Sequence, residues 1–158
     1  MSGTKSSRRT WLGGSVLAGC ATLWAKVTGE EVMYVGGTIA DLPEATEGVM
    51  DIKDSKKMTF SSDKGGFEIA YNSVKTLEYG QKAGRRVGVA LVITVWALFS
   101  KKRKHFLTIG YDDAEGSPQG VVLEIAKGRA KTFITIIEAR SGKKVEYESA
   151  EAKNHVHG

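Results

Sequence analysis

Three stretches in the middle of the chain alternate apolar with polar side chains. They cover residues 50–53, 58–61 and 67–71, and short clusters rich in Gly, Asp, Asn and Ser separate them. A period of two is that of a β-strand with one buried face, and turn residues between such strands are typical of antiparallel hairpins. We therefore expect a mainly β protein, an antiparallel meander of about seven strands. Further strands are expected near 32–39, 74–79, 105–111 and 121–125, and a brief pairing is expected at Val145–Glu148.

The period changes near the C-terminus. Ala130, Phe133, Ile134 and Ile137 are spaced i, i+3, i+4 and i+7, so they form one stripe of a helix. Gly142 follows as a C-terminal stop. Several β-branched residues favour a strand here, but a strand would place Phe133 and Ile137 on the face opposite to Ile134. We therefore predict one C-terminal helix that closes the sheet.

One segment, Val87–Phe99, holds thirteen residues without a charge. As a helix it would span about 20 Å, which is too short to cross a hydrocarbon core of about 30 Å alone. As one strand it would span about 43 Å, which is longer than a small sheet needs. Three interpretations remain: a strand whose distal part faces a membrane or a partner, a wholly buried strand, or a helix inserted at the lipid interface.

Positive charge is concentrated on both sides of this run. The chain has a net charge of +5, whereas residues 82–104 contain seven basic residues and no acid, so the remaining residues sum to −2. Basic residues beside an apolar run favour anionic lipid over nucleic acid, which requires a broad basic face with interleaved aromatics. Alternatively, the charges only keep the segment soluble. The candidate contacts with a membrane or a partner are Arg85, Arg86, Trp96, Phe99, Lys101, Lys102, Arg103 and Lys104.

The N-terminus has the layout of an export signal. Residues 1–9 carry three positive charges, a mildly apolar stretch follows, and then comes Cys20, the only cysteine. The pair Arg8 and Arg9 resembles a twin-arginine export motif, and residues 17–20 (LAGC) resemble the bacterial lipobox. These resemblances imply acylation of Cys20 after removal of the preceding peptide. Plain secretion and an uncleaved N-terminus remain as alternatives.

The order of the expected elements resembles the bacterial pleckstrin-homology-like (PH-like) domain. Residues 67–79, 105–109 and 137–143 are similar to successive strand and helix segments of that family. The resemblance covers about residues 31–148 and implies a PH-like barrel or sandwich of about seven strands with one closing helix.

The phosphoinositide site of the eukaryotic relatives does not carry over to this chain. In those relatives, basic residues of the loop between the first two strands hold the lipid headgroup. The corresponding loop here contains Asp41, Glu44 and Glu47. Any binding would have to use a different surface.

The sequence contains none of the catalytic or phosphate-binding motifs that we looked for. It has no HExxH, no glycine-rich phosphate loop, no paired cysteines and no G-x-S-x-G. Asp112, Asp113 and Glu115 lack the spacing of a calcium loop. His105 is interpreted as a sheet-edge residue, and the H-x-H at 155–157 as tail composition. We therefore expect that the protein is not an enzyme and that it binds no metal and no cofactor.

These observations predict a non-enzymatic lipoprotein anchored in the bacterial cell envelope. Its PH-like domain would contact anionic lipid or a protein partner through residues 82–104. The alternative is a soluble, cytoplasmic or peripherally membrane-associated PH-like domain that uses the same segment for a partner or for dimerisation. The expected division is a removed signal peptide at 1–19, a lipidated cysteine and tether at 20–30, the β domain at 31–148 and a flexible tail at 149–158.

Overall fold

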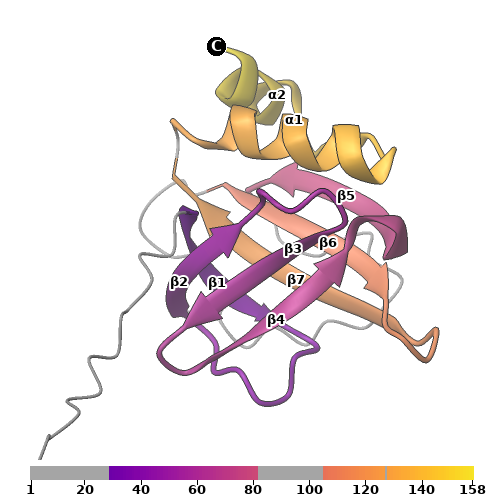
Figure 1. Ribbon diagram of the computed structural model, residues 1–158. Coiled ribbons are helices and arrows are strands. Elements are labelled where there is room, and N and C mark those ends of the chain that lie inside the picture. Colours follow the sequence, from indigo (N-terminus) through magenta and orange to yellow (C-terminus); the bar gives the residue numbers. More distant parts are fainter. Residues whose placement is uncertain (1–28, 82–104, 127) are drawn as a thin grey trace, which may run out of the picture.

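The computed structural model describes residues 29–81, 105–126 and 128–158. They form one mostly antiparallel sheet of eight strands with two short C-terminal helices (Figure 1). The strands are β1 (Glu30–Gly37), β2 (Thr46–Asp51), β3 (Lys57–Ser62), β4 (Gly65–Ala70), β5 (Val74–Gly80), β6 (Phe106–Asp112), β7 (Pro118–Ile125) and β8 (Val145–Tyr147).

The sheet order is β4-β3-β2-β1-β7-β6-β5-β8. Consecutive strands pair as hairpins from β1 to β4 and again from β5 to β7, and β1 joins the two groups by pairing with β7. The sequence therefore predicted the meander correctly, because half-buried strands reveal themselves by their alternation.

The prediction of a closed barrel is wrong, because the sheet is open. The one-turn 3-10 helix η1 (Tyr71–Ser73) separates β4 from β5, and the two strands do not pair. The free side of β5 is instead taken by β8, which returns after the first helix and pairs parallel to β5. The described strands number eight rather than seven.

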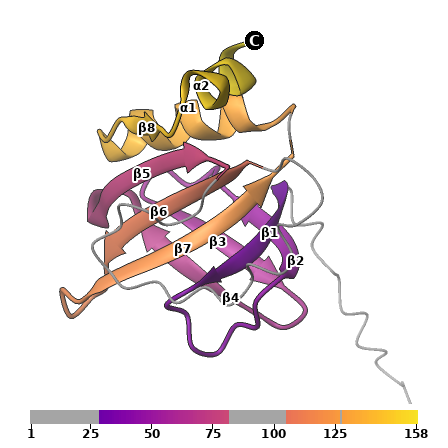
Figure 2. The ribbon, with the colours of Figure 1, turned by 180° about the vertical axis from the view of Figure 1, so that it is seen from behind.

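Helix α1 (Ala130–Ser141) confirms the predicted helix. Its four stripe residues, Ala130, Phe133, Ile134 and Ile137, are all buried in the core. Gly142 ends the helix in the left-handed conformation, with φ of 69°, and its N–H donates to the carbonyl of Glu138. Only a residue without a side chain adopts this backbone readily. Figures 1 and 2 show α1 lying across one end of the curved sheet.

The last residues form a second helix, α2 (Ala150–His157), where the sequence predicted a flexible tail. Ser149 caps its start by accepting a hydrogen bond from the N–H of Ala152. Ala152 and Val156, one helical turn apart, are buried in the same core as α1. This apolar pair and the cap therefore help to dock the helix on the rest of the domain.

Candidate functional site

The predicted functional residues lie outside the residues that the structure describes. This holds for the apolar run Val87–Phe99, for the lipidation and export residues and for all predicted membrane contacts. They are Arg8, Arg9, Cys20, Arg85, Arg86, Trp96, Phe99, Lys101, Lys102, Arg103 and Lys104. What the structure does define is where their segments join the domain.

Both segments join the domain at the same end of the sheet. The register pairs Met33 of β1 with Glu124 of β7, Glu124 with Phe106 of β6, and Phe106 with Gly80 of β5. One row of residues therefore runs across four strands beside the start of β1, the end of β5 and the start of β6. We call this the attachment end (Figure 2).

Residues 82–104 connect two strands that are direct neighbours. Gly80, the last residue of β5, pairs with Phe106, the first residue of β6. The other neighbours of these strands are β8 and β7, and no further described strand lies between β5 and β6. The segment that carries the basic residues therefore leaves the sheet and re-enters it at adjacent points.

The three histidines of the chain lie beside these points. His105 is 8% exposed, and its ring stacks on that of His155 at a centroid distance of 3.8 Å. The Tyr79 hydroxyl and His155 Nδ1 are hydrogen bonded at 3.0 Å, and the Tyr147 hydroxyl bonds His157 Nε2 at 3.1 Å. We call these five residues the histidine–tyrosine cluster.

Burial sets the protonation state of one cluster member. Tyr79 is fully buried, and desolvation raises the pKa of its phenol to about 12. The hydroxyl therefore keeps its proton well into the alkaline range, and it is hydrogen bonded to His155. The cluster connects β5, β6, β8 and α2 by ring stacking and hydrogen bonds.

Glu148 fixes the start of the 82–104 segment. Its Oε2 accepts a hydrogen bond of 2.7 Å from the N–H of Gln81, and its own N–H donates to the carbonyl of Tyr79. A side chain at Gly80 would collide with Glu148, since a Cβ there would lie 2.5 Å from the Glu148 Cβ. The close approach requires glycine at this position.

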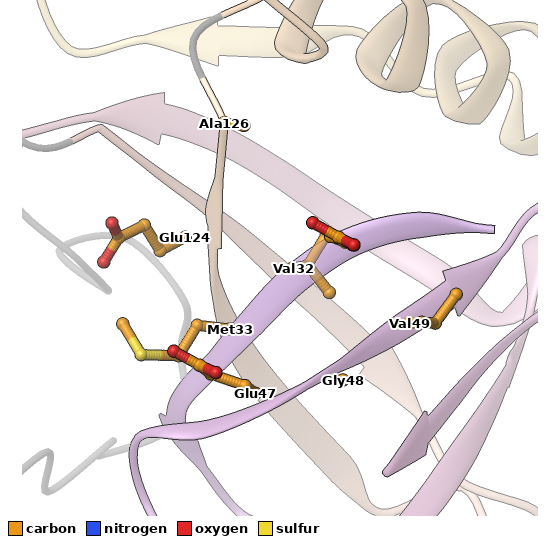
Figure 3. A pocket seen from close by; sticks show the side chains of 8 residues that line it. Val32, Met33, Glu47, Gly48, Val49, Glu124 and Ala126 are labelled. Atoms are coloured by element: carbon orange, nitrogen blue, oxygen red, sulfur yellow. The ribbon is translucent and has the colours of Figure 1, made fainter.

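A groove of about 630 Å³ opens on the sheet face that points away from the core. Figure 3 shows Glu124, Met33 and Glu47, from β7, β1 and β2, side by side along it. Glu31 and Val49 also line the groove. Three carboxylates thus surround apolar side chains in the groove. The groove lies at the attachment end, where the N-terminal segment and residues 82–104 join the domain.

Neither the cluster nor the groove follows from the sequence pattern. The expectation of a flexible tail at 149–158 is wrong for His155 and His157, and the spacing of Ala152 and Val156 is the weak signal for a docked helix. The groove depends on cross-strand register, which pairs Glu47 with Met33 and Met33 with Glu124. The alternation of apolar and polar residues shows which face of the sheet each side chain is on. It does not show which residues of the adjacent strand lie beside it.

Among the described residues, no group of three or more His, Cys, Asp or Glu side chains is arranged to hold a metal ion. Within the same ranges, neither helix has the length and apolar character needed to span a bilayer. The chain matches no model of a known protein family, and a search of curated proteins also finds no relative.

Proposed function

We propose that this protein is a non-enzymatic, membrane-tethered binding domain of the PH-like type that contacts anionic lipid through residues 82–104. The observation that carries the proposal is the common attachment end. By the register of Met33, Glu124, Phe106 and Gly80, the points where the N-terminal segment and residues 82–104 join the domain lie at one end of the sheet.

This geometry lets two weak membrane signals act on the same bilayer. A single acyl chain gives only marginal residence, and stable anchoring requires a second signal such as a polybasic patch. Each Lys or Arg near an anionic surface contributes roughly 1 kcal/mol. Acylated Cys20 supplies the first signal, and the seven basic residues of 82–104 supply the second.

The strand order supports the PH-like assignment. Four strands form one meander, three form a second, and a helix follows β7. In this proposal the acidic first loop plays no part in lipid binding. The working surface is the β5–β6 connection instead.

Vesicle co-sedimentation tests the lipid contact. The full chain with Cys20→Ser, which removes the acylation site, is mixed with vesicles of phosphatidylcholine alone or with added phosphatidylserine. We expect binding only to the anionic vesicles. Replacing Lys101, Lys102, Arg103 and Lys104 by Gln should weaken it by roughly a hundredfold or more, since four charges are lost.

A matched variant shows whether position or total charge matters. Lys53 and Lys56 in the β2–β3 turn, Lys64 in the β3–β4 turn and Lys143 between α1 and β8 are exposed. Replacing these four by Gln removes the same charge and should leave most of the binding intact. Equal losses in both variants, or binding that ignores phosphatidylserine, would refute the lipid contact.

The anchor and the soluble alternative have separate tests. A radioactive fatty acid should label the wild type but not Cys20→Ala, and an unlabelled wild type refutes the lipoprotein assignment. The soluble alternative predicts a concentration-dependent dimer in sedimentation analysis that Trp96→Asp abolishes, together with no vesicle binding.

A further inference from the structure

Strand β4 forms one edge of the open sheet. It is the last strand on its side, and among the described strands it pairs only with β3 (Figure 1). This pairing runs from Gly65 to Ala70 without a register shift, and the strand sequence GGFEIA contains neither lysine nor proline. Proteins commonly protect an exposed edge with these residues or with a bulge. Because β4 has neither device, its edge is suited to accept a further strand.

The backbone groups of Gly66 and Glu68 point to the free side of β4. The N–H of Tyr71 donates to the carbonyl of Lys56 at 2.9 Å, so every second residue of β4, counted back from Tyr71, bonds to β3. The residues between them turn their N–H and C=O groups away from β3. Within residues 29–81, 105–126 and 128–158, no hydrogen bond occupies these groups of Gly66 and Glu68. The edge therefore presents two donors and two acceptors.

A groove of about 540 Å³ borders the same strand. Its walls come from β4 and from the end of β6, two strands that do not pair. Phe67 of β4 and Ile39 of the β1–β2 loop line it, and both are only partly buried against the core. The Phe67 ring stacks on Phe60 at a centroid distance of 5.1 Å. The groove therefore offers fixed apolar surface beside the edge.

The charged side chains that line the groove are mainly acidic. They are three carboxylates, from Glu68, Asp112 and Asp113, and one ammonium, from Lys57. Lys57 forms an ion pair with Glu68 at 2.8 Å, and Lys75 forms one with Asp112 at 3.0 Å. Asp113 has no ion pair among the described residues. The surplus charge is negative, and this favours a cationic occupant.

We propose that β4 binds an extended, cationic segment of a partner protein, which adds to the sheet as a further strand. Main-chain hydrogen bonds to Gly66 and Glu68 would align the segment. An apolar side chain of the segment would pack on Phe67, and its basic side chains would face the carboxylates of the groove. Six residues of β4 correspond to a contact about 20 Å long.

A second copy of this chain is a less suitable occupant of the edge. Two copies that pair through the same edge place identical patches opposite each other. The acidic surplus of one groove would then face that of the other, and like charges across an interface repel. A cationic segment meets the opposite charge.

The groove lies at the end of the sheet opposite to the attachment end. Asp112, which lines the groove, is the last residue of β6, whereas Phe106, the first residue of β6, belongs to the attachment end. The proposal therefore does not depend on the lipid contact, and both surfaces can be occupied at once.

Amide hydrogen exchange, measured by NMR in the full chain with Cys20→Ser, tests the added strand. The probe is a synthetic heptapeptide of alternating lysine and valine, capped at both ends. At saturation it should slow exchange at the amides of Gly66 and Glu68 by about tenfold or more. The amides of Phe67 and Ile69, which already bond to β3, should change little. A matched peptide of alternating glutamate and valine should not protect these amides.

Two variants at one position separate the backbone contact from charge. The Glu68 N–H faces away from β3, so Glu68→Pro removes only an outward donor, a change that edge strands tolerate. It should weaken peptide binding about tenfold, the equivalent of one lost hydrogen bond. Glu68→Gln removes the same charge but keeps the N–H, and it should weaken binding only about twofold.

Several results would overturn the proposal. These are an absence of protection by the lysine peptide, equal protection by the glutamate peptide, and equal losses in Glu68→Pro and Glu68→Gln. Protection of Gly66 and Glu68 without peptide that disappears on dilution would assign the edge to a second copy and overturn it as well. If Glu68→Pro does not fold, the exchange pattern of the Cys20→Ser chain with the two peptides decides.

Discussion

At the scale of single residues, Arg140 connects α1 to the sheet. Its guanidinium donates to the carbonyls of Ile52 and Asp54 and to the Tyr71 hydroxyl, and it lies over the Tyr71 ring. These acceptors come from the β2–β3 turn and from η1, two segments distant in sequence. One planar side chain with several donors therefore holds three elements together.

Replacing Arg140 should destabilise the fold. We expect Arg140→Ala to lower the free energy of unfolding by about 2 kcal/mol, since hydrogen bonds to a charged donor are lost together. Arg140→Lys should retain only part of this stability, because a lysine ammonium cannot reproduce the planar set of donors of the guanidinium. Urea denaturation measures both. Arg129→Ala is the control, since Arg129 is 65% exposed with one contact to Glu30, and an equal loss there would contradict the assignment.

Alkaline pH should weaken the fold through buried tyrosines. Burial raises the pKa values of Tyr34 and Tyr79 from 10.0 to about 12. The folded state holds these protons more tightly, so this contribution to stability is complete below pH 10 and is lost as pH rises through about 12.

Measuring the melting temperature as a function of pH checks the predicted direction of this effect. Its decline above pH 10 should be shallower in Tyr79→Phe, which cannot ionise at this position, than in the wild type. In a titration followed by tyrosine absorbance, Tyr79→Phe should show one fewer tyrosine that ionises at high pH. Parallel declines in the two proteins would show that Tyr79 ionises as it does in the unfolded chain.

At the scale of elements, the sequence predicted what local periodicity controls. The strands from β1 to β7 and the stripe of α1 follow their alternation and helical spacing. The open sheet did not follow from the pattern. The brief pairing expected at Val145–Glu148 is confirmed as β8, but its partner β5 and its parallel direction were not predicted, because they depend on where α1 returns the chain. The predicted site residues lie outside the described ranges, so the structure leaves those predictions as they were.

Helix α2 should detach as a unit when its apolar anchor is lost. Val156 is 5% exposed, and Val156→Asp would place an unpaired charge in the core at a cost of roughly 2–3 kcal/mol. Hydrogen exchange should show lost protection in α2 but not in β6 and β7, since docked terminal elements open locally. Asn154→Asp adds the same charge at an exposed position and should leave α2 protected. Loss of protection throughout the sheet would contradict this picture.

At the scale of the whole molecule, the attachment end combines three features. The N-terminal segment and residues 82–104 join the sheet there. The histidine–tyrosine cluster and Glu148 hold the end of β5, and the groove with Glu47 and Glu124 lies along the same row. The two proposed membrane signals, acylated Cys20 and the basic residues of 82–104, would therefore act on the same side of the domain, which is the condition under which two weak signals add.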